Sequence, residues 1–140
     1  MVGGQANDIL FGQAGSDLVY GNLGDDSCVG GVADDIIRGG QGNDLLWGEH
    51  GEDFLSGDRG SDTITGGVGA DTFHTHAEAG LDRVTDFNAA EGDRVQLLQG
   101  TTYTLRQEGA DVIIDMGSGG MMVLVGVNLA SLPNGWIFGA

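Results

Sequence analysis

The 140-residue sequence has no lysine, one cysteine and one proline, so positive charge and covalent cross-links are both scarce. Five arginines stand against 21 acidic residues, which gives a formal net charge of -16 at pH 7. Nucleic acids and anionic membranes are bound through positive side chains, so this charge argues against both as partners and favours a cation. The single cysteine, Cys28, excludes an internal disulfide, so the fold must be stabilised by other means.

Sequence signals for membranes, export and catalysis are missing as well. No apolar run approaches the length of a membrane span, and no basic-then-apolar leader precedes the first glycines. The zinc signature H-E-x-x-H, the G-x-S-x-G elbow, the P-loop lysine, the dinucleotide-binding G-x-G-x-x-G and the EF-hand loop are absent. We therefore expect a non-catalytic module rather than an enzyme. Repeats that begin at residue 3 without an N-terminal cap also lead us to expect a C-terminal fragment of a longer protein.

Glycine, in contrast, is abundant, because 28 residues are about three times the usual share. Residues 3–74 divide into eight contiguous nonapeptides, of which GGQGNDLLW is typical. The first position is always glycine, the sixth always aspartate and the eighth always apolar. The aspartates are Asp8, Asp17, Asp26, Asp35, Asp44, Asp53, Asp62 and Asp71. The apolar residues are Leu10, Val19, Cys28, Ile37, Leu46, Leu55, Ile64 and Phe73.

This short period predicts a solenoid. Each repeat supplies a strand of three residues, which cannot bury its one inward side chain unless many such units stack into a continuous core. If two nonapeptides complete one coil, about four coils follow one another at the strand spacing of about 4.8 Å. Odd and even repeats then form two separate sheets, and the eighth-position side chains fill the space between them.

The same stacking places the aspartates in two columns. Unit charges about 5 Å apart repel by about 1 kcal/mol in water, and by more at a partly desolvated surface, so a cation is needed between the loops. Two stacked carboxylates together with the carbonyls of glycine-rich turns match the flexible oxygen cage that calcium prefers over magnesium. Four loops on each side leave three gaps per column, so we expect about six calcium ions, with the eight aspartates as ligands.

The pattern GGxGxDxUx resembles the RTX, or hemolysin-type, calcium-binding repeat of type I secreted bacterial proteins. The stretch GADTFHTHAEAGLDRVTDFNAAEGDRVQL, residues 69–97, is similar to the boundary that closes the roll in this family, and GVNLASLPNGWIFGA resembles its uncleaved C-terminal export signal. The resemblance implies a right-handed parallel β-roll that folds on calcium binding outside the cell. It also implies the type I secretion machinery and an upstream domain of a parent protein as partners.

Beyond the repeats the sequence texture changes. Apolar and polar residues alternate in TTYTLRQ, ADVIIDM and MMVLVGV, with QEGA and GSGG between them as turns, which predicts an antiparallel β cap ending near Trp136. We therefore expect an all-β chain with two parts, a calcium-binding roll at residues 3–74 and a roll-closing, capping and secretion-signal region at residues 75–140.

Several alternatives remain open at this stage. A carbohydrate or cell-surface binding module would use Arg38, Trp47 and Arg59, and a rigid spacer would need no ligand at all. His74 and His76 are spaced to share one strand face but lack a third metal ligand. Further residues define three other hypotheses. A further metal site at the end of the roll would use Asp82, Asp86 and Asp93. The second glycine of the repeat is replaced at four positions, which could weaken calcium binding at individual sites: Gln13, Asn22, Glu49 and Asp58. An outward apolar stripe that docks a partner would consist of Phe11, Val29, Trp47, Leu18, Ile36 and Phe54.

Overall fold

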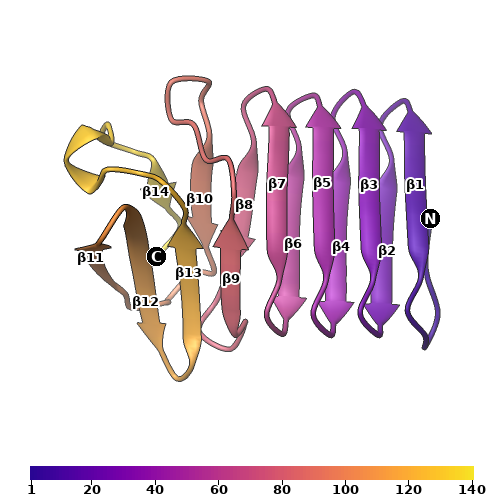
Figure 1. The fold of residues 1–140 in the computed structure, drawn as a ribbon, viewed down its shortest axis with the longest axis horizontal. Helices are drawn as coiled ribbons and strands as arrows, with labels where there is room; N and C mark the ends of the chain where they lie inside the picture. The colour runs from indigo at the N-terminus through magenta and orange to yellow at the C-terminus, as the bar shows by residue number, and fades with distance from the viewer.

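A computed structural model describes all 140 residues and shows a flattened solenoid of about five turns (Figure 1). One sheet has eight strands, in the order β1 (Ile9–Ala14), β3 (Ser27–Val32), β5 (Leu45–His50), β7 (Thr63–Val68), β9 (Leu81–Val84), β13 (Gly120–Leu124), β12 (Asp111–Gly117) and β11 (Thr104–Glu108). The other has six, in the order β14 (Ile137–Phe138), β10 (Arg94–Leu97), β8 (Thr72–Thr75), β6 (Phe54–Arg59), β4 (Ile36–Gln41) and β2 (Leu18–Leu23). A single 3₁₀ turn, η1, spans Leu129–Ser131.

The predicted division into an odd and an even sheet is confirmed, and the repeats stack in register. Each residue pairs with the one 18 positions later, as Leu10 does with Cys28 and Val19 with Ile37, and all these pairings are parallel. The predicted strand length of three residues is wrong, because β1 to β7 each contain six. The first three positions of the following repeat continue the ladder, since their glycines leave the backbone free to pair.

The core is a single file of apolar side chains between the two sheets. From Val19 to Phe73 every eighth-position residue is fully buried, and Leu10 at the N-terminal end is 9% exposed. Cys28 belongs to this file, as its place in the repeat predicts, and burial raises the pKa of its thiol to about 12. The thiol is therefore a small apolar core group and not a reactive one.

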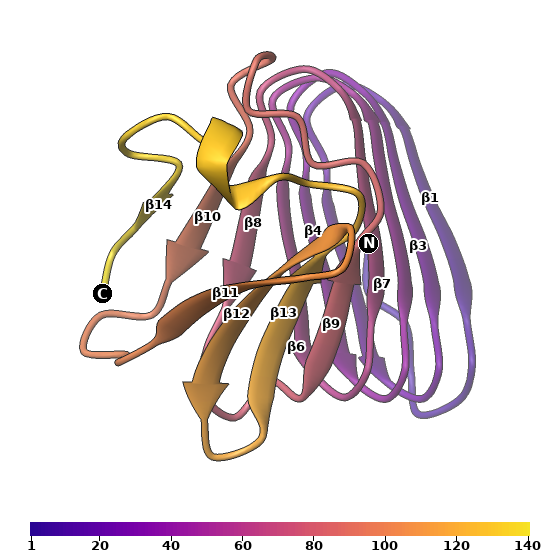
Figure 2. The ribbon, with the colours of Figure 1, turned by 60° about the vertical axis from the view of Figure 1, so that its left-hand side comes forward.

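The solenoid continues past the last nonapeptide. Val84 of β9 pairs with Ile64, and Val95 of β10 pairs with Phe73. Relative to the 18-residue coil of the repeats, these two coils therefore contain two and four additional residues. The predicted antiparallel cap is confirmed as β11, β12 and β13, but it is joined to the roll by parallel pairing of β13 with β9. Strand β14 similarly extends the even sheet beside β10 (Figure 2).

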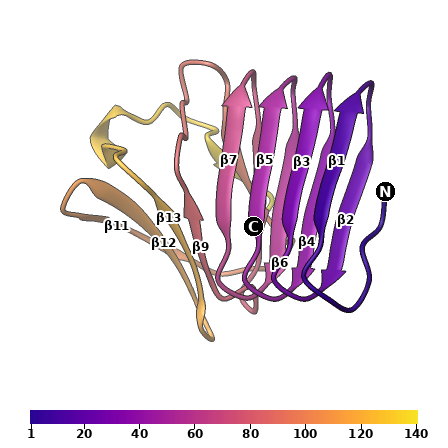
Figure 3. The ribbon, with the colours of Figure 1, turned by 45° about the vertical axis from the view of Figure 1, so that its right-hand side comes forward.

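The cap closes the open end of the core. Phe87 lies with its ring centroid 6.0 Å from that of Phe73 and 6.0 Å from that of Trp136, which forms an aromatic plug at the end of the file. The hairpin of β12 and β13 projects at this end of the molecule, opposite the N-terminus (Figure 3). The structure contains no helix that could span a membrane.

Several apolar side chains do point outward, as the repeat positions predict. Phe11, Leu18 and Ile36 are each about half exposed, whereas Val29, Trp47 and Phe54 are only partly exposed. The first group lies toward the N-terminal coils on both sheets.

Candidate metal centre

The repeat aspartates line the two edges of the roll, where one sheet turns into the other (top and bottom in Figure 1). We call the segments that lead into the odd strands the odd edge and those that lead into the even strands the even edge. The odd edge consists of residues 3–8, 21–26, 39–44, 57–62 and 77–82. The even edge consists of residues 12–17, 30–35, 48–53, 66–71 and 86–93. The six repeat aspartates from Asp26 to Asp71 are at most 2% exposed, although aspartate is usually a surface residue.

From Asp26 to Asp71, one oxygen of each repeat aspartate accepts a hydrogen bond from the backbone of the preceding coil. The Asp26 N–H donates to Asp44 Oδ1 and the Asp44 N–H donates to Asp62 Oδ1, both at 2.7 Å. The even edge repeats the arrangement, because the Asp35 N–H donates to Asp53 Oδ1 at 2.8 Å. These bonds lock each carboxylate in one orientation and keep neighbouring coils in register.

The second oxygen of these aspartates has no partner. Seven buried Oδ2 atoms accept no hydrogen bond, those of Asp17, Asp26, Asp35, Asp44, Asp53, Asp62 and Asp71. A buried anionic oxygen without a hydrogen bond costs several kcal/mol, so a periodic row of them is not a stable end state for a protein. Each one needs either a proton or a cation.

Backbone carbonyls lie in the same gaps between coils. A side chain at Gly42 would collide with the Gly24 carbonyl, and one at Gly39 would meet both Asp44 Oδ2 and the Gly57 carbonyl, which lies 2.8 Å from the position of the missing Cβ. Gly42 also has a φ of 140°, in the region that side chains disfavour. Glycine is therefore required here because a carbonyl oxygen of the neighbouring coil occupies the place of a side chain.

The electrostatics of the aspartate columns favour protonation. Burial raises the pKa of Asp44 and Asp71 to about 7 and that of Asp53 to about 6, and neighbouring carboxylates add to these shifts. The backbone N–H bonds oppose the shifts only in part. At neutral pH the columns therefore hold negative charge that their surroundings do not compensate.

These features fit a hard divalent cation. Each gap offers two carboxylates and backbone carbonyls, all oxygen ligands of the kind that calcium accepts in six- to eightfold coordination. No group of three or more His, Cys, Asp or Glu side chains converges anywhere in the chain, so the carbonyls must supply the remaining ligands. The same result counts against a transition-metal site at His74 and His76, whose ring centroids are 6.3 Å apart.

Sequence reasoning missed a second ladder at the fifth repeat position. The Asp25 N–H donates to Asn7 Oδ1 at 2.9 Å, and the Asn43 N–H donates to Asp25 Oδ1 at 2.8 Å. These side chains bond toward the following coil, whereas the sixth-position aspartates bond toward the preceding one. Asparagine or aspartate at the fifth position of half the repeats was the available signal.

The three aspartates beyond the repeats lie at the ends of the two columns, but not together. Asp82 follows Asp62 on the odd edge, and Asp93 follows Asp71 on the even edge, each as acceptor of the corresponding N–H. Both Asp86 oxygens accept backbone N–H groups, from Gly66 at 2.9 Å and Gly67 at 2.8 Å. They therefore do not form a single site of three carboxylates.

The residues expected to bind a carbohydrate are also separated. Trp47 lies on β5 of the odd sheet, whereas Arg38 and Arg59 lie on β4 and β6 of the even sheet. These three residues therefore do not lie together on one sheet, because alternate repeats belong to different sheets. Arg38 is paired with Asp58 at 2.9 Å and lies 5.9 Å from the Tyr20 ring centroid.

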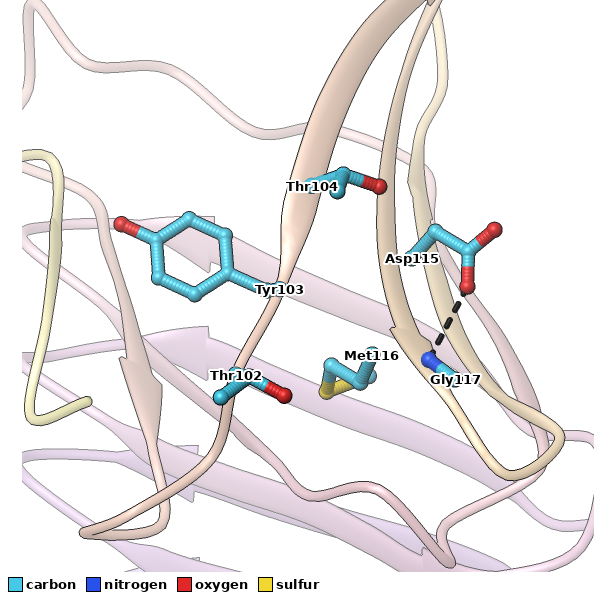
Figure 4. Close-up of a pocket in the computed structure, with 6 residues that line it drawn as sticks. All are labelled: Thr102, Tyr103, Thr104, Asp115, Met116 and Gly117. Carbon is cyan, nitrogen blue, oxygen red and sulfur yellow. Dashed lines mark hydrogen bonds between the residues drawn. The ribbon is translucent and has the colours of Figure 1, made fainter.

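An open pocket in the cap lies between the start of β11 and the end of β12 (Figure 4). Tyr103, Thr102 and Met116 line it, but the only charged group, Asp115, is already occupied. Its carboxylate accepts the Gly117 N–H at 3.0 Å and pairs with Arg106 at 3.1 Å. This pocket therefore lacks a free charged group that could bind a ligand.

The fold and the loops together define a metal-binding β-solenoid. The sequence matches the family model of the RTX calcium-binding nonapeptide repeat (4 copies) over residues 2–33, 29–64 and 51–80. The chain belongs to this family, whose repeats bind calcium. A comparison with curated protein sequences gave no match.

Solved structures of similar fold include two modules of one enzyme. The AlgE6R3 subunit of the Azotobacter vinelandii mannuronan C5-epimerase is 27% identical, with a TM-score of 0.61 over 91% of this chain and 81% of that one. The AlgE6R2 subunit is 24% identical, with a TM-score of 0.59 over 99% and 91%. The extracellular lipase LipA from Serratia marcescens shares the fold at 16% identity and a TM-score of 0.53, and this chain covers 39% of it.

Proposed function

We propose that the chain is a calcium-dependent folding module of a secreted parent protein, and that the eight repeat aspartates, Asp8 to Asp71, bind about six calcium ions between the coils. The observation that carries this proposal is the row of seven buried carboxylate oxygens without a hydrogen-bond donor. Family membership and the oxygen-rich gaps between glycine-shaped turns support calcium as the cation.

Calcium binding and folding are one event in this proposal. Without the ion, each column places buried carboxylates about one strand spacing apart, and ordering 28 glycines costs more backbone entropy than ordering any other residue type. Each ion that binds only the folded roll stabilises it by mass action. The chain would then remain unfolded where calcium is scarce and fold where calcium is abundant.

This behaviour suits passage through a secretion channel. Extracellular calcium modules of this ligand type work at about 10⁻⁴ to 10⁻³ M, well above cytosolic calcium. A chain that is unfolded inside the cell can be threaded through the type I machinery, and folding outside would prevent its return. Extracellular location and an upstream domain of the parent protein, as cargo, belong to this proposal.

The test is far-UV circular dichroism during a calcium titration that starts in chelator, with magnesium as the control ion. We expect a cooperative gain of β signal with calcium alone. A fully folded spectrum in chelator would contradict the proposal, because the core and cap would then be sufficient for folding.

We also propose a division of labour between residues 3–74, which bind calcium, and residues 75–140, which close and cap the roll and carry the export signal. Val112, Ile114 and Leu124 of the cap are fully buried and continue the apolar core of the roll, so the cap covers its open end. Strand β13 of the cap pairs with β9, so the cap offers a strand against which the last coil of the roll can form. A chain without residues 101–140 should need more calcium to fold, and unchanged calcium sensitivity would count against this division.

A second candidate function is carbohydrate binding on the odd sheet. It is favoured by a shallow pocket of about 270 Å³ that Trp47, Glu49, His50 and Thr65 line, and by the likeness to modules of a mannuronan epimerase. An indole face beside polar groups suits a sugar ring. Retention on a uronate polymer column in calcium, lost in Trp47→Ala but kept in Arg38→Ala, would support it, whereas no retention of the wild type would exclude it.

A further inference from the structure

The odd edge continues regularly beyond the last nonapeptide. Val84 pairs with Ile64, so Asp82 takes the next place in the column after Asp62 although 20 residues separate the two aspartates. The Asp62 N–H donates to Asp82 Oδ1 at 3.3 Å, as each N–H of this column donates to the next carboxylate. The segment 77–82 therefore acts as a fifth odd-edge loop that the nonapeptide pattern does not reveal.

The backbone of this fifth loop repeats the turn of the calcium-binding loops. A side chain at Gly80 would collide with the Gly60 carbonyl, just as one at Gly60 would collide with the Gly42 carbonyl. The Gly60 N–H donates to the Ala79 carbonyl at 2.7 Å, which matches the bond from the Gly42 N–H to the Arg59 carbonyl at 3.0 Å. The carbonyl stacking of the odd edge thus extends by one further gap.

The gap between Asp62 and Asp82 contains carboxylate oxygens without adequate partners. Asp62 Oδ2 is buried and accepts no hydrogen bond. Asp82 is completely buried, and its Oδ2 has only the Thr75 hydroxyl at 3.5 Å. Two buried carboxylates therefore border this gap, and neighbouring hydrogen-bond donors offset little of their charge.

The even edge ends differently. Asp93 accepts two backbone N–H groups, from Asp71 on Oδ1 and from Asn88 on Oδ2, each at 2.9 Å, so neither oxygen is free. The carbonyl stacking also stops there, because Gly92 lies against the side chain of Ala70 instead of a carbonyl of the preceding loop. Both oxygens of Asp86 accept hydrogen bonds from the backbone N–H groups of Gly66 and Gly67, so they are not free either.

We infer that the odd edge has a fourth cation site between Asp62 and Asp82, closed by the Gly60 carbonyl, whereas the even edge has only three sites, so that the folded chain binds seven calcium ions. The inference rests on the proposed calcium-binding function and adds to it a site outside the repeats. Asp82 thereby couples the first coil of the roll-closing region to calcium.

The test is to count bound calcium by native mass spectrometry in the wild-type chain and in two isosteric variants, Asp82→Asn and Asp93→Asn. We expect seven ions in the wild type, six in Asp82→Asn and seven in Asp93→Asn. Both variants remove one buried charge at the end of a column, so they differ only in which edge they affect. Gly80→Ala gives a second route to six ions, because its side chain would displace the Gly60 carbonyl and leave both carboxylates intact.

The outcomes separate the two proposals. Six ions in the wild type, or seven in a folded Asp82→Asn chain, would overturn the additional site and leave the repeat sites standing. Equal losses in Asp82→Asn and Asp93→Asn would overturn the difference between the edges. A wild-type chain that binds no calcium would overturn the proposed function and the additional site together.

Discussion

Two neighbouring aspartates, Asp25 and Asp26, allow a direct test of the calcium columns. Asp26 is 1% exposed and lies between Asp8 and Asp44 in the odd column, whereas Asp25 is exposed. Asparagine replaces either residue with the same change of charge and almost the same shape. At the fifth position asparagine already makes the required bond, since Asn43 Oδ1 accepts the Ser61 N–H at 2.9 Å.

The expected magnitude follows from the number of gaps that Asp26 serves. An ion with a dissociation constant of about 10⁻⁴ to 10⁻³ M stabilises the folded state by about 1.4 to 2.7 kcal/mol at about 10 mM calcium. Asp26 borders two gaps, so losing both ions in Asp26→Asn should lower the free energy of unfolding by about 3 to 5 kcal/mol. Asp25→Asn should change it by less than about 0.5 kcal/mol, as a surface substitution does.

The sign of the Asp26→Asn effect should reverse without calcium. In chelator the variant removes a buried anion from between two others, so any residual structure should become more stable. The assay is chemical denaturation followed by circular dichroism, with calcium and with chelator, together with a count of bound ions. Equal effects of the two substitutions in calcium, or a loss of stability in chelator, would refute the reasoning that the sixth-position carboxylates are metal ligands.

Other predictions follow from the same geometry. Gly42→Ala should prevent folding at calcium concentrations that fold the wild type, because its side chain would collide with a carbonyl of the preceding coil. Gly15 also has a positive φ, of 100°, but open space around it, so Gly15→Ala should cost only about 1 to 2 kcal/mol. Equal calcium midpoints for folding of the two variants would argue against the carbonyl cage. Leu46→Ala should lower the free energy of unfolding by about 2 to 5 kcal/mol and the half-exposed neighbour Leu45→Ala by far less, as measured by denaturation in calcium. In chelator, the pKa of Asp44 is raised to about 7 in the folded chain, well above its value of about 4 in the unfolded chain. Protonation of Asp44 therefore stabilises the folded state fully below about pH 4, and this stabilisation is lost as the pH rises through about 7. Acidification should therefore increase the β signal of the calcium-free chain, and a β signal that falls on acidification would contradict this linkage.

Much of the roll can be predicted because every nonapeptide has the same residue types at the same three positions. Glycine at the first position, aspartate at the sixth and an apolar residue at the eighth place Leu46 in the core and Asp44 at the edge, and the structure confirms both positions. Eight copies remove the ambiguity that one nonapeptide would leave, since a shift of one residue would turn the whole row of eighth-position side chains out of the core. Calcium chemistry follows from the same columns, and membership of the RTX family agrees with it.

The tertiary structure decided the features that the nonapeptide period does not specify. Strands of six residues rather than three form because pairing with the coils on either side extends the ladder into the glycines. Only the packing shows which oxygen of Asp44 is bonded and which of its oxygens is free. The different ends of the two edges, at Asp82 and Asp93, likewise depend on insertions of two and four residues, whose register no repeat specifies. Sequence alone therefore determined the columns, whereas long-range backbone pairing decided where each of them ends.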